Sequence, residues 1–271
     1  MNGASREALA AARERLDALT DSTSVDAGSL ADELAAVTAL LDREVSLRRV
    51  LTDPAQAAEA KAELAQRLLG TQVSGPAADL VAGMVRSRWS QSRDLVDALE
   101  VLADTADLTA AQQAGKLDDV EDELFRFGRI ISGSTELRAA LTDRKATTSA
   151  KGELLRSLLG GRAQSATERL VTRLVTAPRG RSLESGLESL SKLAADRRDR
   201  MVAIVTSAVP LSDPQKQRLG AALAKLYGRT MHLNLDVDPE VLGGIRVQVG
   251  DEVINGALVD RIEDASRRLA G

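Results

Sequence analysis

The sequence predicts an α+β protein that is mostly α-helical, with two tandem helical bundles followed by a small C-terminal α/β domain. Valine and isoleucine occupy 14 positions in residues 1–200 but 13 positions in residues 201–271, and β-branched residues favour strands. The first 200 residues are instead rich in Ala, Leu, Glu and Arg, which favour helix. A third observation, an internal repeat, divides the helical part in two.

The repeat has a period of 90 residues. Residues 47–85 align with residues 137–175 without a gap, and 15 of the 39 positions are identical. Composition alone would give identity at roughly a tenth of positions in so biased a chain. A period this long indicates a duplicated domain rather than a solenoid of short repeats. We therefore expect one bundle at residues 1–105, its copy at residues 106–200, and a separate domain at residues 201–271.

Helical periodicity supports each bundle. Stripes with spacing i, i+4, i+7, i+11 predict two amphipathic helices: Leu30, Leu34, Val37 and Leu41 in the first copy, and Val120, Leu124, Phe127 and Ile131 in the second. Further helices are expected with Ala60, Leu64 and Leu68 as an apolar stripe that ends at Gly70, and with Leu80, Val81, Met84 and Val85. The first helix, around residues 9–19, has a weaker counterpart at residues 108–117. Residues 103–108 contain no Gly or Pro, which indicates a continuing helix.

The C-terminal domain is expected to follow a βαβββα order. A β-branched run at residues 201–209 ends at Pro210, and Ser212 or Asp213 can cap a helix that carries Leu219, Leu223 and Leu226. Alternation places Leu233, Leu235 and Val237 on the buried side of a strand. Gly250-Asp251 predicts a hairpin turn after residues 245–249. A last helix would carry Leu258, Ile262, Ala265 and Leu269.

Composition excludes several kinds of chemistry. The chain has no cysteine and one histidine, His232, so disulfides, thiolate metal sites and multi-histidine sites are excluded. We find no phosphate loop of the Gly-x-x-x-x-Gly-Lys-Ser/Thr type and no Gly-x-Ser-x-Gly nucleophile elbow. The formal net charge is -4, and the basic cluster Arg197, Arg198 and Arg200 lacks aromatic stacking partners, so nucleic acid is not an expected partner. No apolar stretch is long enough for a membrane span. These exclusions favour a binding protein without cofactors over an enzyme.

Two features could contact a partner protein. The stripe Leu9, Ala12, Leu16 and Leu19 is typical of internal packing, and a groove for a partner helix is the alternative. Trp89 could fill the core or anchor an interface, where tryptophan is enriched.

The tail resembles the delta subunit of F-type ATP synthase, a family that includes the mitochondrial oligomycin-sensitivity-conferring protein. The resemblance rests on residues 205–212 and 233–251, with Asp238, Gly243, Gly244, Gly250 and Asp251 at the family spacing. The family continues with Ile-Asp-Gly-Ser, whereas this chain has Ile-Asn-Gly-Ala at residues 254–257, which keeps Gly256. These glycines can also serve backbone turns without touching a partner.

The helical part resembles the family more diffusely. The family's Leu-Arg-x-x-Leu-x-x-Pro segment stands at residues 47–54 in the first copy, which has Ser92-Arg93 in place of Gly-Arg. The second copy keeps Gly180-Arg181 but has Arg144 where the proline would be. The usual family chain has one bundle, so the additional residues look like a duplication.

The resemblance implies a role without chemistry. A delta subunit is a static strut of the rotary enzyme, located at the cytoplasmic face of the bacterial plasma membrane as a peripheral subunit. Its bundle receives N-terminal segments of the alpha subunits of the catalytic head, and its C-terminal domain holds the b-type stalk helices. On this basis Leu9, Ala12, Leu16, Leu19, Leu80, Met84 and Trp89 are the expected head-binding residues. An unrelated helical adaptor or regulatory binding module is the alternative.

Overall fold

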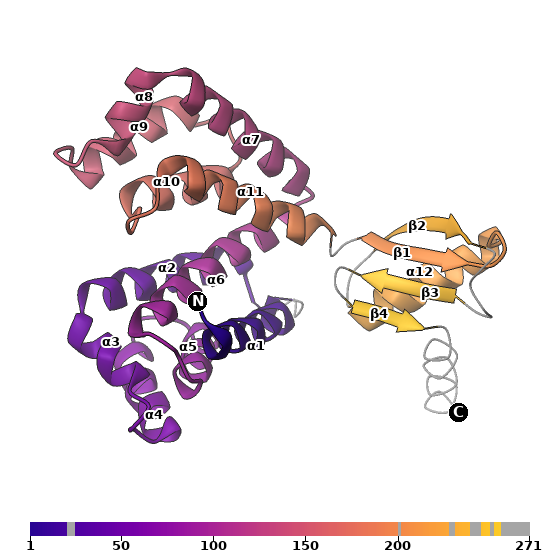
Figure 1. The fold of residues 1–271 in the computed structure, drawn as a ribbon, viewed down its shortest axis with the longest axis horizontal. Coiled ribbons are helices and arrows are strands. Elements are labelled where there is room, and N and C mark those ends of the chain that lie inside the picture. The colour runs from indigo at the N-terminus through magenta and orange to yellow at the C-terminus, as the bar shows by residue number, and fades with distance from the viewer. Residues whose placement is uncertain (21–24, 200–201, 228–230, 239–244, 250–251, 256–271) are drawn as a thin grey trace. The chain divides into compact units, whose positions relative to one another are not determined.

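The computed structural model in Figure 1 describes residues 1–20, 25–199, 202–227, 231–238, 245–249 and 252–255. The chain forms two compact units, Met1–Ala194 and Ala195–Gly271. The first is helical and the second contains a four-stranded sheet. This confirms the predicted α+β class with a mostly helical body. The boundary between the units lies within α11 (Leu183–Asp199), close to the position expected from the change in composition.

The helices of the first unit follow the sequence repeat. The first copy contributes α1 (Gly3–Thr20), α2 (Ala27–Arg43), α3 (Val45–Thr52), α4 (Ala58–Leu69), α5 (Gly75–Arg86) and α6 (Ser92–Gln113). The second contributes α7 (Leu117–Gly133), α8 (Thr135–Thr142), α9 (Thr148–Leu159), α10 (Ser165–Thr176) and α11. The helices α2 to α5 recur as α7 to α10 with the same lengths and bounds 90 residues apart.

Local capping chemistry fixes where these helices begin. The carboxylate of Asp26 accepts a hydrogen bond of 2.6 Å from the amide of Ser29 at the start of α2. Ser74 caps α5, which has Pro76 in its first turn, and Thr147 caps α9 in the same way. Such caps satisfy amide groups that the helix itself leaves unpaired.

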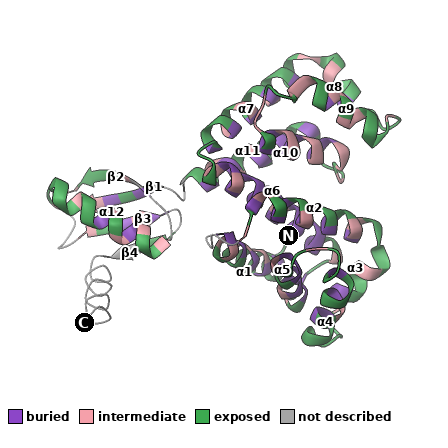
Figure 2. Ribbon diagram, turned by 180° about the vertical axis from the view of Figure 1, so that it is seen from behind, coloured by how far each residue is buried: buried purple, intermediate pink, exposed green. Residues whose placement is uncertain are grey.

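The core of the first copy is a continuous cluster of Leu, Val and Ala side chains with one aromatic, Trp89. Figure 2 shows the buried residues on the inward sides of these helices. The predicted stripes of α2, α5 and α7 are buried, which confirms them. The stripe predicted for α4 is wrong: Ala60 and Leu68 are exposed, and the helix buries Lys61, Ala62, Ala65 and Leu69 instead. Helix α4 packs on α5, and of the predicted stripe only Leu64 packs against the core.

Helix α6 links the two copies. It runs without a break through residues 103–108, as predicted, and through the expected boundary at residue 105. It packs on α1, α2 and α3, and also on α7 and α10. The expected counterpart of the first helix at residues 108–117 is not a separate helix, because Leu108 lies in α6 and Leu117 begins α7. One long helix therefore contacts helices of both sequence copies.

The second unit is a sheet with strand order β2-β1-β3-β4. Its elements are β1 (Val202–Ser207), α12 (Asp213–Tyr227), β2 (His232–Val237), β3 (Ile245–Val249) and β4 (Glu252–Asn255). Strand β1 pairs in parallel with β2 and antiparallel with β3, and β3 pairs antiparallel with β4. Leu219 and Leu223 of α12 pack with Ala203, Val205 and Val247 of the sheet. Ser212 and Gln215 hydrogen bond at the start of α12 in the manner of a capping box.

Three apolar residues of this unit depart from the expected pattern. Leu226, Leu235 and Val237 are all exposed, although each was predicted to be buried. The strand itself is confirmed, but β2 is an edge of the sheet, so its side chains have fewer covering neighbours among the described residues. The predicted last helix and Gly243, Gly244, Gly250, Asp251 and Gly256 lie outside the described residues.

Candidate interaction sites of the helical unit

Five of the seven expected head-binding residues lie in the core of the first bundle. Ala12, Leu16, Leu80, Met84 and Trp89 are buried. The remaining two, Leu9 and Leu19, are partly buried at the edge of the same core. The seven residues are therefore brought together, with five inside the bundle and two reaching its surface.

Polar contacts lock this end of the first bundle. The indole of Trp89 donates a hydrogen bond of 2.8 Å to the carbonyl of Met84. The hydroxyl of Ser5 donates to the carboxylate of Asp94 at 2.7 Å and accepts from the amide of Ser90 at 2.8 Å. Each of these buried groups thus has a partner, which keeps α1 fixed to the start of α6.

The surface of α1 and α5 carries several small residues. The two helices pack side by side, and Gly83 of α5 leaves room for the guanidinium of Arg15, which lies 2.2 Å from where a Cβ would stand. Ala11 and Ala18 of α1 are exposed and share the side of Arg15, since residues three and four apart lie on one face of a helix. We call Ala11, Arg15, Ala18 and Gly83 the α1–α5 face.

The corresponding face of the second copy is closed by ionic contacts. Gly83 is replaced 90 residues later by Arg173 of α10, which pairs with Asp107 and, at 3.1 Å, with Asp104 of α6. Arg169, one turn earlier on α10, also pairs with Asp107. The Asp107 side chain is 0% exposed, so the two arginines compensate a carboxylate that has no access to water.

Two more arginines of the second copy, Arg179 and Arg181, form ion pairs with acidic residues of the first copy. Arg181 donates to both carboxylate oxygens of Glu100 at 2.7 Å. Arg179 lies 3.5 Å from Glu100 and 3.4 Å from Asp42 of α2. We call Glu100, Asp104, Asp107, Arg169, Arg173, Arg179 and Arg181 the ionic clasp. The acidic members lie on α6 and the basic members on α10 and the loop that follows it.

Burial shifts the protonation of one clasp residue. Removal from water raises the pKa of Asp104 to about 7, and the neighbouring Glu100 and Asp107 act in the same direction, while Arg173 opposes them. Because three carboxylates lie close together here, repulsion between their negative charges favours the state in which one of them is protonated.

The clasp was not expected from the sequence, although a signal was present. The repeat aligns Arg169 and Arg173 with Asp79 and Gly83 of the first copy. At these two positions, where the copies differ in charge or size, the second copy contacts α6. Comparing the copies for differences as well as for identities would have found these arginines.

The second unit contributes Asp238 of the expected family motif. Its amide donates a hydrogen bond of 3.0 Å to the carbonyl of Ser207, which joins the end of β2 to the end of β1. Asp238 therefore has a structural position at the edge of the sheet.

The described residues do not form a group of three or more His, Asp or Glu side chains arranged to hold a metal ion. In the same part of the chain, no helix combines the length and apolar character needed to cross a bilayer. What the helical unit does present is packed helices, an ionic clasp and surfaces between helices, which suit the binding of other proteins.

Comparison with known proteins identifies the family. The family model "ATP synthase delta (OSCP) subunit" matches residues 105–269, which include the second copy and the second unit. The protein named ATP synthase subunit delta of Streptomyces coelicolor is 87% identical over 270 residues, covering 100% of this chain and 98% of that protein. The protein of the same name from Thermobifida fusca is 49% identical over 271 residues, covering 100% of both chains.

A solved structure also matches. A chain of the Toxoplasma gondii mitochondrial ATP synthase hexamer is 20% identical with a TM-score of 0.29, over 62% of this chain and 97% of that chain. The family model and the full-length relatives agree with each other. This chain belongs to the ATP synthase delta (OSCP) subunit family, and it is a non-catalytic subunit of the peripheral stalk.

Proposed function

We propose that this chain joins the catalytic head to the stalk by binding a different partner with each of its units. The helical unit binds N-terminal segments of the alpha subunits, and the second unit holds the b-type stalk helices. The complex sits at the cytoplasmic face of the bacterial plasma membrane. The observation that carries this proposal is the relative named ATP synthase subunit delta, 87% identical over the whole chain.

The helical unit consists, on this proposal, of two bundle copies that share α6, and the first copy makes the head contact. The family model matches the second copy, but there the face equivalent to α1–α5 is taken up by the ionic clasp. Helix α2 of the first copy also borders this part of the second copy: Asp32 and Ala35 of α2 line a cavity together with Arg169 and Arg173 of α10. On the α1–α5 face of the first copy, the side chain of Arg15 covers Gly83, whereas Ala11 and Ala18 are exposed.

The chemistry of the α1–α5 face suits an incoming helix. Ala11 and Ala18 are small and exposed, so a second helix can approach α1 closely beside Arg15, and the partly buried Leu19 lies next to Ala18. Apolar side chains at i, i+3 and i+4 of a partner helix could pack there, which is how amphipathic helices bind grooves. Leu16 and Met84 lie beneath the face and support it, so replacing them would test folding rather than binding.

A substitution on the surface tests the head contact. Ala18→Trp places an indole on the α1–α5 face without entering the core, and we expect it to weaken binding to ATP synthase stripped of this chain by about 10-fold. Ala60→Trp, at an exposed position of α4, is the matched control and should bind like the wild type. An Ala18→Trp variant that binds as tightly as the control would remove the α1–α5 face from the proposal.

The second unit offers exposed apolar residues for the stalk. Leu226 at the end of α12 and Leu235 and Val237 on β2 are exposed in the described part of this unit. An edge strand with apolar side chains readily pairs with or packs on another chain. Leu235→Asp together with Val237→Asp should reduce retention of stalk subunits in a pull-down while head binding persists. Unchanged stalk retention would show that the stalk binds elsewhere.

A further inference from the structure

A second candidate interface lies in the second copy, away from the α1–α5 face, and shares Arg181 with the ionic clasp. A cavity of about 810 Å³ opens between α8, the loop before α9, the end of α10 and the start of α11. Its apolar lining comes from Leu141, Leu174, Val175, Pro178 and Leu183. This volume is in the range of sites that hold a ligand of several side chains. We call it the α8–α11 pocket.

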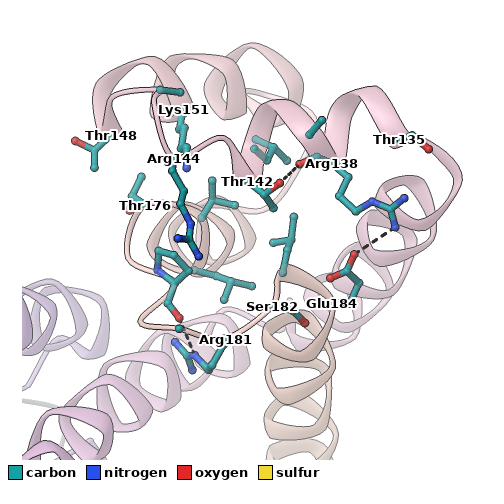
Figure 3. Close-up of a pocket in the computed structure, with 18 residues that line it drawn as sticks. Thr135, Arg138, Thr142, Arg144, Thr148, Lys151, Thr176, Arg181, Ser182 and Glu184 are labelled. Carbon is teal, nitrogen blue, oxygen red and sulfur yellow. Dashed lines mark hydrogen bonds and ion pairs between the residues drawn. The ribbon is translucent and has the colours of Figure 1, made fainter.

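The pocket has an excess of positive charge. Four of its lining residues are basic and one, Glu184, is acidic. Arg138 pairs with Glu184 at 3.5 Å, and Arg181 is engaged by Glu100. Arg144 and Lys151 both line the pocket and form no ion pair or side-chain hydrogen bond with any described residue (Figure 3). Two free cations above an apolar floor favour a ligand with both apolar and acidic groups.

The first copy indicates what size of group such a site accepts. Pocket residues Leu174 and Lys151 correspond to Met84 and Lys61 in the repeat. In the first copy, Trp89 is buried with its indole bound to the carbonyl of Met84. Lys61 is buried too, and its burial lowers the pKa of its ammonium group. The first copy therefore fills this end of its bundle with its own tryptophan.

The second copy lacks that filling side chain. The loop after α10, residues 177–182, contains no aromatic side chain, and the side chain of Arg179 in this loop is directed toward Asp42 and Glu100 of the ionic clasp. Its side chain is 7% exposed, and it is absent from the residues that line the pocket. Because Arg179 is held in the clasp, it does not fill the pocket, which is lined by other residues of the loop after α10.

We propose that the α8–α11 pocket binds a segment of another ATP synthase subunit in which a bulky apolar side chain stands next to an acidic residue. The apolar side chain takes the place that Trp89 fills in the first copy, and the acidic residue pairs with Arg144 and Lys151. This inference rests on the proposed function, because it assumes that the chain works inside the complex. It adds a second contact to the one on the α1–α5 face.

Charge reversal at the pocket is the first test. The double variant Arg144→Glu, Lys151→Glu should bind ATP synthase stripped of this chain at least 10-fold more weakly than the wild type. The matched control is Arg162→Glu, Lys192→Glu, which changes the net charge equally at exposed positions outside the pocket and should stay within twofold of the wild type. Equal affinity of the two double variants would overturn the pocket. Failure of the wild-type chain to bind would instead overturn the proposed function.

Cross-linking inside the assembled complex is the second test. Since the chain has no cysteine, Ala139→Cys creates a single thiol at the pocket, to which a benzophenone maleimide can be attached. We expect mass spectrometry to recover a cross-linked segment of another subunit in which Asp or Glu neighbours a large apolar residue. Cross-links confined to this chain, or to a basic segment of a partner, would contradict the proposal.

Discussion

Asp107 shows at the scale of one residue why the two copies stay together. A carboxylate with no access to water is unfavourable by several kcal/mol unless cations compensate it, and Arg169 and Arg173 do so from a neighbouring helix. The energy gained by forming such a buried pair is small, but the loss on removing one partner is large.

Removing one partner of this pair should therefore be costly. We expect Arg173→Ala to lower the free energy of unfolding of the helical unit by about 3–5 kcal/mol, because it leaves Asp104 and Asp107 without their shared cation. The control Arg126→Ala breaks an exposed pair with Asp122 on α7 and should lower it by less than about 1 kcal/mol. Urea unfolding followed by circular dichroism measures both. Similar losses in the two variants would mean that the clasp contributes little.

The pKa of Asp104 predicts a pH dependence of stability. Its folded-state pKa of about 7 lies above the ordinary 3.8, so the folded state binds this proton more tightly than the unfolded state. The contribution is complete below about pH 4 and is lost as pH rises to 7, with a slope of up to about 1.4 kcal/mol per pH unit.

Replacing this carboxyl should remove the slope. Between pH 5 and pH 7 the unfolding free energy of Asp104→Asn should fall less steeply, or rise more, than that of the wild type. The exposed Asp118→Asn is the control, and its unfolding free energy should follow that of the wild type at each pH. Urea titrations at several pH values measure the unfolding free energy of each variant. A parallel pH profile for Asp104→Asn and the wild type would show that Asp104 does not carry the proton.

Residue-level prediction from the sequence succeeded where burial follows periodicity. Leu16, Leu80 and Met84 recur at helical spacing, and all three are buried. The same pattern could not tell that most of the stripe faces the bundle interior rather than a partner, because core packing and partner binding require the same spacing. The predicted burial of Leu235 and Val237 was wrong for a related reason. Alternation predicts which side chains share one face of a strand, but it does not predict what covers that face.

At the scale of elements, close contact between α10 and α11 depends on a glycine. A Cβ at Gly186 of α11 would stand 2.2 Å from Cδ1 of Leu174 of α10. At this contact the two helices approach to a distance that only a residue without a side chain permits, and a larger residue must displace the buried Leu174.

Alanine at two glycines should have opposite effects. Gly186→Ala should lower the unfolding free energy by about 1–3 kcal/mol through overpacking against Leu174. Gly128→Ala lies within α7, where a Cβ would meet nothing within 4 Å, so it should raise stability by about 0.5–1 kcal/mol through higher helix propensity. Thermal unfolding compares the two variants directly. Equal shifts of Tm in the same direction would contradict the packing of α10 on α11.

The order of the helices was accessible from the sequence, but the role of α6 was not. A repeat of 90 residues gives the same helices twice, and the absence of Gly and Pro at residues 103–108 predicts continuity. That α6 also packs against the second copy depends on Asp104 and Asp107 meeting arginines far along the chain. Contacts between residues 60 or more positions apart leave no periodic signal.

At the scale of the whole molecule, joining two bundles through one helix and a buried clasp suits a static connector. A single continuous helix bends less readily than a linker rich in glycine, and the clasp adds a second connection between the copies. A stalk subunit has to resist torque while it holds its partners, so rigidity between its contact points is what its function requires.

The most direct test of the stator role uses inverted membrane vesicles stripped of this chain. If the chain braces the head, stripped vesicles should still hydrolyse ATP in the catalytic head but should lose ATP synthesis driven by a proton gradient. Adding the purified chain back should restore synthesis. Stripped vesicles that make ATP at the rate of untreated vesicles would contradict the account.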